Sequence, residues 1–200
     1  MEFNLKKWVQ VVNFFAKKEQ EKIWTAIDKL KILKLVWIAD RLHLRKYWKL
    51  IVWDTYFAMK FWPVASWIKN ICDKNETFLP KNANIYINTY LQKFENSIKS
   101  RKEIDLLQFS DSNIEVLTQV YEKFWNNKWY KLVDITHKYP EWKKFETKLK
   151  TWTISQAQMS YFDFFENTPE QDSIFDISEE HLELTKDIFQ ENLEFDRLFS

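Results

Sequence analysis

Side chains of the kinds that enzymes use as ligands, bases or nucleophiles are few and scattered in this sequence of 200 residues. The three histidines, His43, His137 and His181, have no second histidine or cysteine at metal-ligand spacing, so the sequence predicts no zinc site. The single cysteine, Cys72, lies among apolar residues in the run WIKNIC and is expected to pack as a small hydrophobic side chain. A lone cysteine also excludes an internal disulfide framework.

Two carboxylates, Asp40 and Asp54, could in principle work as a general acid and base. The simpler interpretation is that Asp54 caps a helix that follows it, while Asp40 pairs with a nearby arginine. No phosphate-binding loop of the GxxxxGK[ST] or GxGxxG type can be built, even if tryptophans are read as glycines. We therefore expect no enzyme, with no catalytic residue, no metal and no cofactor.

Charge is distributed very unevenly along the chain, although the net charge is only +1. Residues 163–200 hold twelve acidic side chains against Lys186 and Arg197, a net charge of −10 that leaves +11 for residues 1–162. A basic body with an acidic tail predicts either docking of the tail on its own body or a basic partner.

The composition is that of a globular protein, with 46% hydrophobic and 30% charged residues. No apolar run approaches the ~18 residues of a membrane span. The first ten residues, MEFNLKKWVQ, lack the apolar core of a signal peptide, which predicts a cytoplasmic protein.

Glycine and tryptophan usage is abnormal, with 0 glycines and 11 tryptophans. Average usage predicts roughly 14 glycines in a chain of this length. Trp48, Trp53, Trp62 and Trp125 stand in turn contexts, where glycine is the usual residue. Our hypothesis is that most tryptophans occupy glycine positions of the natural protein because a codon was read with the wrong translation table. The alternative is a deliberately glycine-free variant.

Hydrophobic spacing predicts a mainly α fold. A helix over 25–47 is apolar almost all round and is expected to be buried at the centre. Asp54 is placed to cap a helix through Tyr56 and Met59 that ends at Pro63, and a β-hairpin is expected over about 84–108. Further helices are expected over 4–20, 64–73, 110–124, 131–138, 141–150, 154–165 and 178–192. The fold class is thus a compact helical domain with one short hairpin and an acidic C-terminal helical tail.

The run from Lys46 to Val64 carries a resemblance once Trp48, Trp53 and Trp62 are read as glycine, which turns it into KYGKLIVGDTYFAMKFGPV. This closely resembles the Panacea domain of SocA-like antitoxins, with its pattern YGRPI-x-GD-x-Y-x-AM-x-x-GPV. The matching positions are Leu35, Ala39, Asp40, Tyr47, Ile51, Asp54, Tyr56, Ala58, Met59, Pro63 and Val64. Lys49 and Leu50 depart from the usual Arg-Pro.

A second block, residues 109–144, is similar to another segment of the same family. The matching positions there are Ser110, Leu117, Val120, Leu132, Thr136, His137 and Trp142. The two blocks follow in the correct order, and the resemblance covers roughly residues 5–165. It divides the chain into a Panacea-like domain, 1–165, and an acidic extension, 166–200.

The resemblance implies a toxin-neutralising antitoxin that acts by direct protein contact, encoded beside its toxin on a mobile element or phage, or an adaptor that delivers the toxin to a protease. It implies that most motif residues are structural. The expected structural set is Asp40, Tyr47, Asp54, Tyr56, Ala58, Met59, Pro63, Val64, Ser110, Thr136, His137 and Trp142.

For the surface that binds the toxin, the sequence favours the basic segment near residue 45 and the amphipathic acidic tail, which could lie in a groove of a basic toxin. The candidate residues are Arg41, Arg45, Lys46, Phe175, Phe189 and Phe195. The alternative function is a nucleic-acid-binding regulator that uses the basic, aromatic segment RLHLRKYWK and the hairpin.

Overall fold

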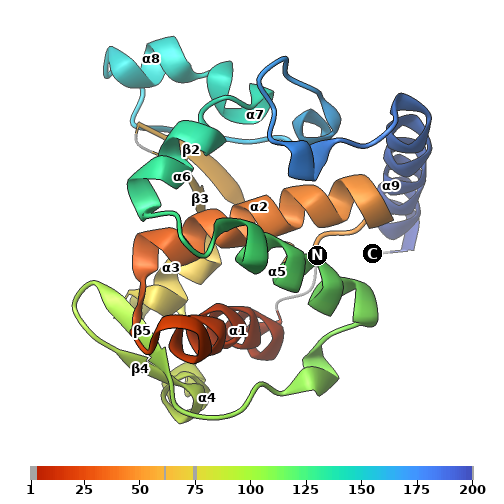
Figure 1. The fold of residues 1–200 in the computed structure, drawn as a ribbon. Helices are drawn as coiled ribbons and strands as arrows, with labels where there is room; N and C mark the ends of the chain where they lie inside the picture. Colours follow the sequence, from red (N-terminus) through yellow and green to blue (C-terminus); the bar gives the residue numbers. More distant parts are fainter. Residues whose placement is uncertain (1–3, 61, 74–75, 200) are drawn as a thin grey trace.

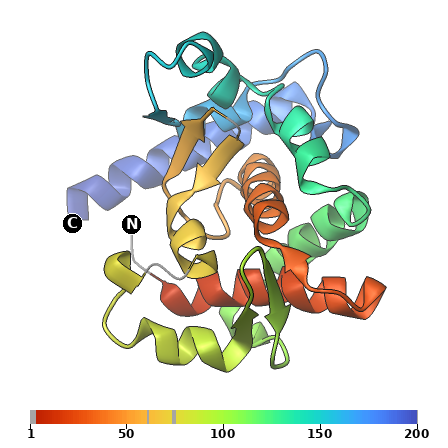
Figure 2. The same ribbon diagram turned by 90° about the vertical axis from the view of Figure 1, so that its left-hand side faces the viewer.

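Helix α2 (Lys29–Tyr47) is the central element of the fold. The structure is a computed structural model that describes residues 4–60, 62–73 and 76–199. Every residue of α2 from Lys31 to Arg45 is buried, as expected for a helix that is apolar almost all round. Figure 2 looks nearly along α2 and shows the other elements arranged around it. The helix begins after Asp28, whose Oδ1 accepts from the backbone N–H groups of Leu30 and Lys31, and not at Thr25.

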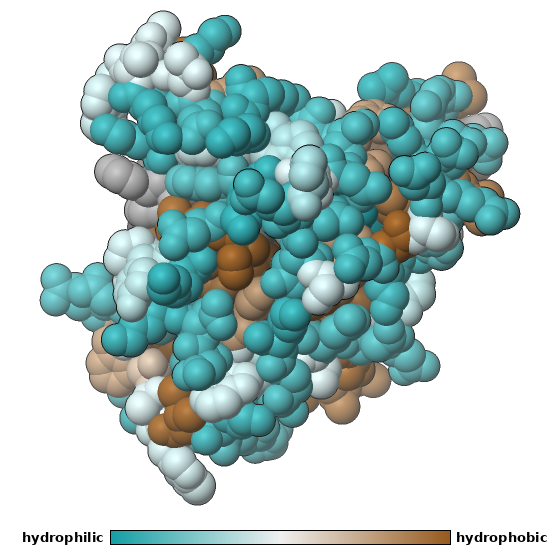
Figure 3. Space-filling model, turned by 45° about the horizontal axis from the view of Figure 1, so that its top comes forward, coloured by the Kyte–Doolittle hydropathy of each residue, from teal (hydrophilic) through white to brown (hydrophobic). Residues whose placement is uncertain are grey.

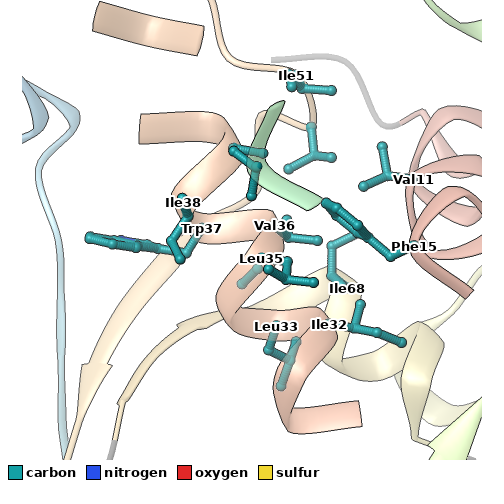
Figure 4. Close-up of a cluster of buried hydrophobic side chains, with 14 of the residues drawn as sticks. Val11, Phe15, Ile32, Leu33, Leu35, Val36, Trp37, Ile38, Ile51 and Ile68 are labelled. Atoms are coloured by element: carbon teal, nitrogen blue, oxygen red, sulfur yellow. The ribbon is translucent and has the colours of Figure 1, made fainter. Parts of the chain in front are cut away.

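The helices that pack against α2 include α1 (Leu5–Ile23), α3 (Ser66–Cys72), α5 (Asp111–Phe124), α6 (Trp129–Thr136) and α9 (Glu179–Phe199) (Figure 1). Each lies where hydrophobic spacing predicted a helix, with ends shifted by up to three residues, except that α9 continues past the predicted end at 192 to Phe199. Figure 4 shows the core between α1, α2 and α3 (Ser66–Cys72), where Phe15 lies close to Val36 and Ile68.

A three-stranded antiparallel sheet replaces the helix expected after Asp54. Strands β2 (Tyr56–Met59), β3 (Trp62–Ala65) and β6 (Gln156–Gln158) run in the order β3-β2-β6. The prediction was wrong because burial alternates along β2, with Tyr56 and Ala58 inward, which is the period of a strand. The prediction of a helix over 154–165 was also wrong, since this range contains β6 and then the short 3-10 helix η3 (Tyr161–Phe165).

The predicted hairpin is confirmed over a shorter span, as β4 (Leu91–Lys93) and β5 (Ser97–Ser100). β1 (Ile27–Asp28) pairs with the other edge of β5. The first part of the expected hairpin is instead α4 (Ala83–Tyr90), because Ala83 and Ile87, four residues apart, are both buried. Shorter elements are η1 (Glu76–Phe78), η2 (Leu106–Gln108), α7 (Pro140–Lys143), α8 (Glu146–Lys150) and η4 (Ser173–Phe175).

Tryptophans occupy backbone conformations that favour glycine. Five described residues have positive φ, and four of them are Trp24, Trp48, Trp53 and Trp152, at 51–61°. Trp24 and Trp48 lie directly after the last residues of α1 and α2, the position where helices commonly end with glycine. Glycine adopts such conformations without the steric cost of a Cβ. Trp125, in contrast, has a φ of −53°. The backbone of Trp62 belongs to β3, while its side chain lies outside the described residues.

Replacing Trp24 by glycine is expected to stabilise the protein. The left-handed conformation costs a residue with a Cβ about 1–2 kcal/mol, and the Trp24 side chain is 86% exposed, so little packing is lost. Chemical denaturation should show Trp24→Gly about 1 kcal/mol more stable than Trp24→Ala, which also lacks the indole but keeps a Cβ. Equal stability of the two variants would contradict a strained backbone at this position.

Candidate functional site

Asp40 of α2 binds the loop that connects α2 to β2. Its Oδ1 accepts from the backbone N–H groups of Ile51 (2.7 Å) and Val52 (3.1 Å), and its Oδ2 accepts from the Tyr56 hydroxyl (2.9 Å). The expected pairing of Asp40 with an arginine is therefore wrong. Burial raises the pKa of Asp40 to about 7, although the three hydrogen bonds act in the opposite direction. Asp40 thus determines the path of the motif loop.

The raised pKa of Asp40 predicts a pH-dependent stability. The folded chain holds the Asp40 proton more tightly than the unfolded chain, whose aspartate pKa is about 4. This contribution is therefore fully present below about pH 4 and is lost as the pH rises to about 7. The free energy of unfolding of wild type relative to Asp40→Asn should fall by about 2–4 kcal/mol over that window in denaturation series. If this difference in free energy of unfolding stayed constant with pH, the raised pKa of Asp40 would be contradicted.

Asp54 caps α3 across the β2–β3 hairpin. Its carboxylate accepts from the backbone N–H groups of Trp67 (3.0 Å) and Ile68 (2.8 Å) and from the Ser66 hydroxyl (3.1 Å). Asp54 is thus a helix cap, as predicted, but of the helix after the hairpin. Burial raises its pKa to about 6.

The remaining motif residues of the first block complete this framework. Ala58, Pro63 and Val64 are buried in the β2–β3 hairpin. The Tyr47 hydroxyl, at the end of α2, donates to Glu115 of α5 (2.8 Å). These residues therefore contact other parts of the same chain.

The second motif block joins the first through Trp142. The Trp142 indole N–H donates to the Met59 backbone carbonyl (2.9 Å), and its ring stacks on His137 with centroids 3.6 Å apart. Thr136 is buried beside them, and Ser110 caps α5 with a reciprocal capping box. His137 lies directly after the last residue of α6 and is stacked on an aromatic ring.

A cleft of about 400 Å³ opens beside His137. Ion pairs at its rim join Lys138 to Glu170 (3.6 Å) and Lys143 to Glu146 (2.7 Å). The lining residues are Asp134, His137, Lys138, Lys143, Glu146, Thr168, Pro169 and Glu170. The lining contains no serine or cysteine, and Thr168 is its one hydroxyl side chain.

His43, near the end of α2, is held neutral inside the protein. Its Nδ1 lies 2.6 Å from the Lys49 carbonyl, and its Nε2 lies 3.0 Å from the amide nitrogen of Asn113. A donor at Nδ1 and an acceptor at Nε2 describe the neutral ring. Burial lowers its pKa to about 4.

Arg41 and Arg45, predicted as partner contacts, are both fully buried. Arg41 Nη1 lies 2.6 Å from Glu141 Oε1, and Nη2 donates to the Glu166 carbonyl (2.6 Å). Arg45 donates to backbone carbonyls of η3 and η4 and to the Asn167 side chain. In the folded chain neither guanidinium reaches a partner, because the segment that follows η3 covers both.

Of the other four predicted partner contacts, two lie in the core and two at the surface. Phe175 and Phe189 are buried in the common core, where Phe189 lies 6.0 Å from the Trp53 ring. Lys46 is partly exposed and pairs with Glu115 (2.7 Å), and Phe195 is 61% exposed. Of the six candidates, only Lys46 and Phe195 lie where another molecule can touch them.

Other groups of the site have no signal in the local sequence. Tyr161 donates to the Asp54 backbone carbonyl, which ties η3 to the motif loop. Glu19 accepts from Lys31 and from the Tyr121 hydroxyl in a buried network between α1, α2 and α5.

Among residues 4–60, 62–73 and 76–199, no three or more His, Cys, Asp or Glu side chains are grouped so as to hold a metal ion. Within the same ranges, no helix has the length and apolar character needed to cross a bilayer.

The fold and this site define a mainly helical domain in which the polar motif residues hold the loops and helix ends of the chain itself. The chain belongs to the family described as Antitoxin SocA-like, Panacea domain, whose family model matches residues 32–143. The match confirms the resemblance seen in the sequence and supports an antitoxin role in general terms. Comparisons with curated proteins and with solved structures gave no match.

Proposed function

We propose that this chain neutralises a cognate toxin by binding it directly. The single observation that carries the proposal is the family match over residues 32–143. The matched motif residues Asp40, Asp54 and Trp142 bind to backbone groups of the same chain, so they build a scaffold. The outer surface of that scaffold is then available for recognition.

The test is co-expression in a heterologous host of the gene adjacent to this one, with and without this chain. We expect growth arrest from the neighbouring gene alone and recovery when the chain is present. Toxicity that the chain does not relieve would contradict the proposal. The proposal would also be contradicted if the adjacent gene were not toxic and its product did not bind this chain.

A protease adaptor would relieve toxicity by a different route, since rescue would then need a protease. Repeating the co-expression in hosts that lack individual cytoplasmic proteases separates the two. Direct neutralisation predicts rescue in every such host and an unchanged level of the toxin. Loss of rescue in one protease-deficient host, with accumulation of the toxin, would establish the adaptor.

The nucleic-acid-binding alternative relied on the basic segment 41–49. Arg41 and Arg45 are buried, so phosphate contacts there would be limited to Lys46 and Lys49. A steep loss of DNA affinity with rising salt would nevertheless identify such a regulator.

A further inference from the structure

Helix α9 carries two separate apolar stripes, of which the inner one is buried and the outer one is mostly exposed. The inner stripe packs on the end of α2 and on η3: Leu182 and Phe189 are buried, and the Thr185 hydroxyl donates to the Arg45 carbonyl (3.2 Å). His181 Nε2 adds a contact with the Lys46 carbonyl (3.0 Å). This inner stripe attaches the helix to the body.

The outer stripe faces away from that contact. Leu184, Phe195 and Leu198 are 57%, 61% and 80% exposed, and Ile188 lies between them, half-buried. Positions 184, 188, 191, 195 and 198 are spaced by four and three residues in turn, the spacing of a helix seam that packs on another element. Glu191 is the single polar residue in this seam.

The side chains of α9 are exposed mainly in its C-terminal half. Beyond Phe189, every described side chain to position 198 is exposed except Leu193. Figure 2 shows this end of the helix extending past the rest of the molecule toward the C-terminus. In Figure 3 the lobe at the right, where α9 lies, is mostly hydrophilic with hydrophobic atoms between. A projecting amphipathic helix can enter a groove on another protein without changing its own contacts with α2.

Charge selects the kind of partner. α9 contains seven acidic side chains against Lys186 and Arg197, and all seven are exposed: Glu179, Glu180, Glu183, Asp187, Glu191, Glu194 and Asp196. This charge repels nucleic acid, an anionic bilayer and the same helix of a second copy. It attracts a basic protein surface and accelerates association with it.

We infer that the outer face of α9, formed by Leu184, Ile188, Phe195 and Leu198 with the surrounding carboxylates, is the surface that binds a basic apolar groove of the toxin. The inference rests on the proposed function and names the surface and the partner chemistry for it. The apolar side chains supply the contact area, and the carboxylates select a partner of opposite charge.

The structure also determines how this must be tested. Removing residues 172–200 would delete Phe175, Leu182 and Phe189, which belong to the core, so a truncation would report on folding. Substitutions on the outer stripe avoid that problem because those side chains are exposed. The test variant is Leu184→Ser/Phe195→Ser/Leu198→Ser. The matched control is Ile85→Ser/Leu106→Ser/Leu107→Ser, whose side chains are 70%, 56% and 93% exposed on other elements.

The purified full-length variants and wild type are each titrated with the purified product of the adjacent gene. In a second assay, each is co-expressed with the adjacent gene and growth rescue is measured. We expect the α9 variant to bind at least about tenfold more weakly and to lose rescue, with an unchanged melting temperature. The control should bind within about twofold of wild type. A second variant, Glu191→Lys/Glu194→Lys, should slow association.

Other outcomes overturn the inference in distinguishable ways. Rescue by wild type and by the α9 variant alike, with equal affinity, would leave the proposed function standing and reject this surface. A dimer of wild type that the α9 variant abolishes would identify a second copy as the occupant. Failure of wild type to bind or neutralise the neighbouring product would reject the proposed function and this inference together.

Discussion

Replacing Arg41 by methionine is expected to lower the free energy of unfolding by about 3–5 kcal/mol. Arg41 and Glu141 form an ion pair at 2.6 Å in which both side chains are 0% exposed. Burial raises the pKa of Glu141, and Arg41 counteracts this effect. Without the guanidinium, the fold must either bury an uncompensated carboxylate or protonate it. The Glu166 carbonyl loses its donor as well.

Equilibrium denaturation of four proteins measures this effect: wild type, Arg41→Met, Glu141→Leu and the double variant. The double variant should regain much of the loss, because no buried charge is then left without a partner. The exposed pair of Lys22 and Glu122 is the control, and Lys22→Met should cost less than about 1 kcal/mol. A loss of that small size for Arg41→Met would contradict a buried pair.

Replacing Arg45 by methionine is expected to cost about 3–5 kcal/mol and to loosen the C-terminal region first, because each buried carbonyl left without a donor costs about 1–3 kcal/mol. Arg45 connects α2 to η3, to η4 and to the segment between them through five hydrogen bonds of 2.6–3.3 Å. Their acceptors are the carbonyls of Phe164, Phe165, Glu166 and Phe175 and the side chain of Asn167.

Hydrogen exchange locates the damage. In Arg45→Met, amides over 161–189 should lose protection before those of α1 and α5, because Arg45 binds the segment that leads into α9. Arg45→Lys keeps the charge but lacks the forked donor group, so it should fall between wild type and Arg45→Met. Uniform loss of protection across the chain, or none, would contradict the role of Arg45 as the attachment of this segment.

Hydrophobic spacing predicted most of the helices because the period of α2, α5 and α9 is a local property of the sequence. The elements that hydrophobic spacing did not predict depend on contacts between distant segments. Asp54 was correctly predicted to cap a helix, but the hairpin between Asp54 and Ser66 placed its partner twelve residues away. The short run at Tyr56–Met59 fits both periods, and only its pairing with β3 and β6 decides for a strand.

The two arginines show the same limit more sharply. Arg41 and Arg45 stand four residues apart on one face of α2, which in sequence looks like a basic surface. Their partners, Glu141 and the carbonyls that end η3 and η4, come 100 or more residues later. No local pattern reports such pairs. The motif itself was predictable because its residues and spacing are visible in the sequence, even with tryptophan where the family pattern has glycine.

The most direct measurement of the central claim is whether the purified chain and the purified product of the adjacent gene form a complex. Size-exclusion chromatography with light scattering should show one species containing both proteins, under conditions in which the chain abolishes the toxic activity and no protease is present. Two separate peaks, with the toxic activity unchanged, would contradict neutralisation by direct binding.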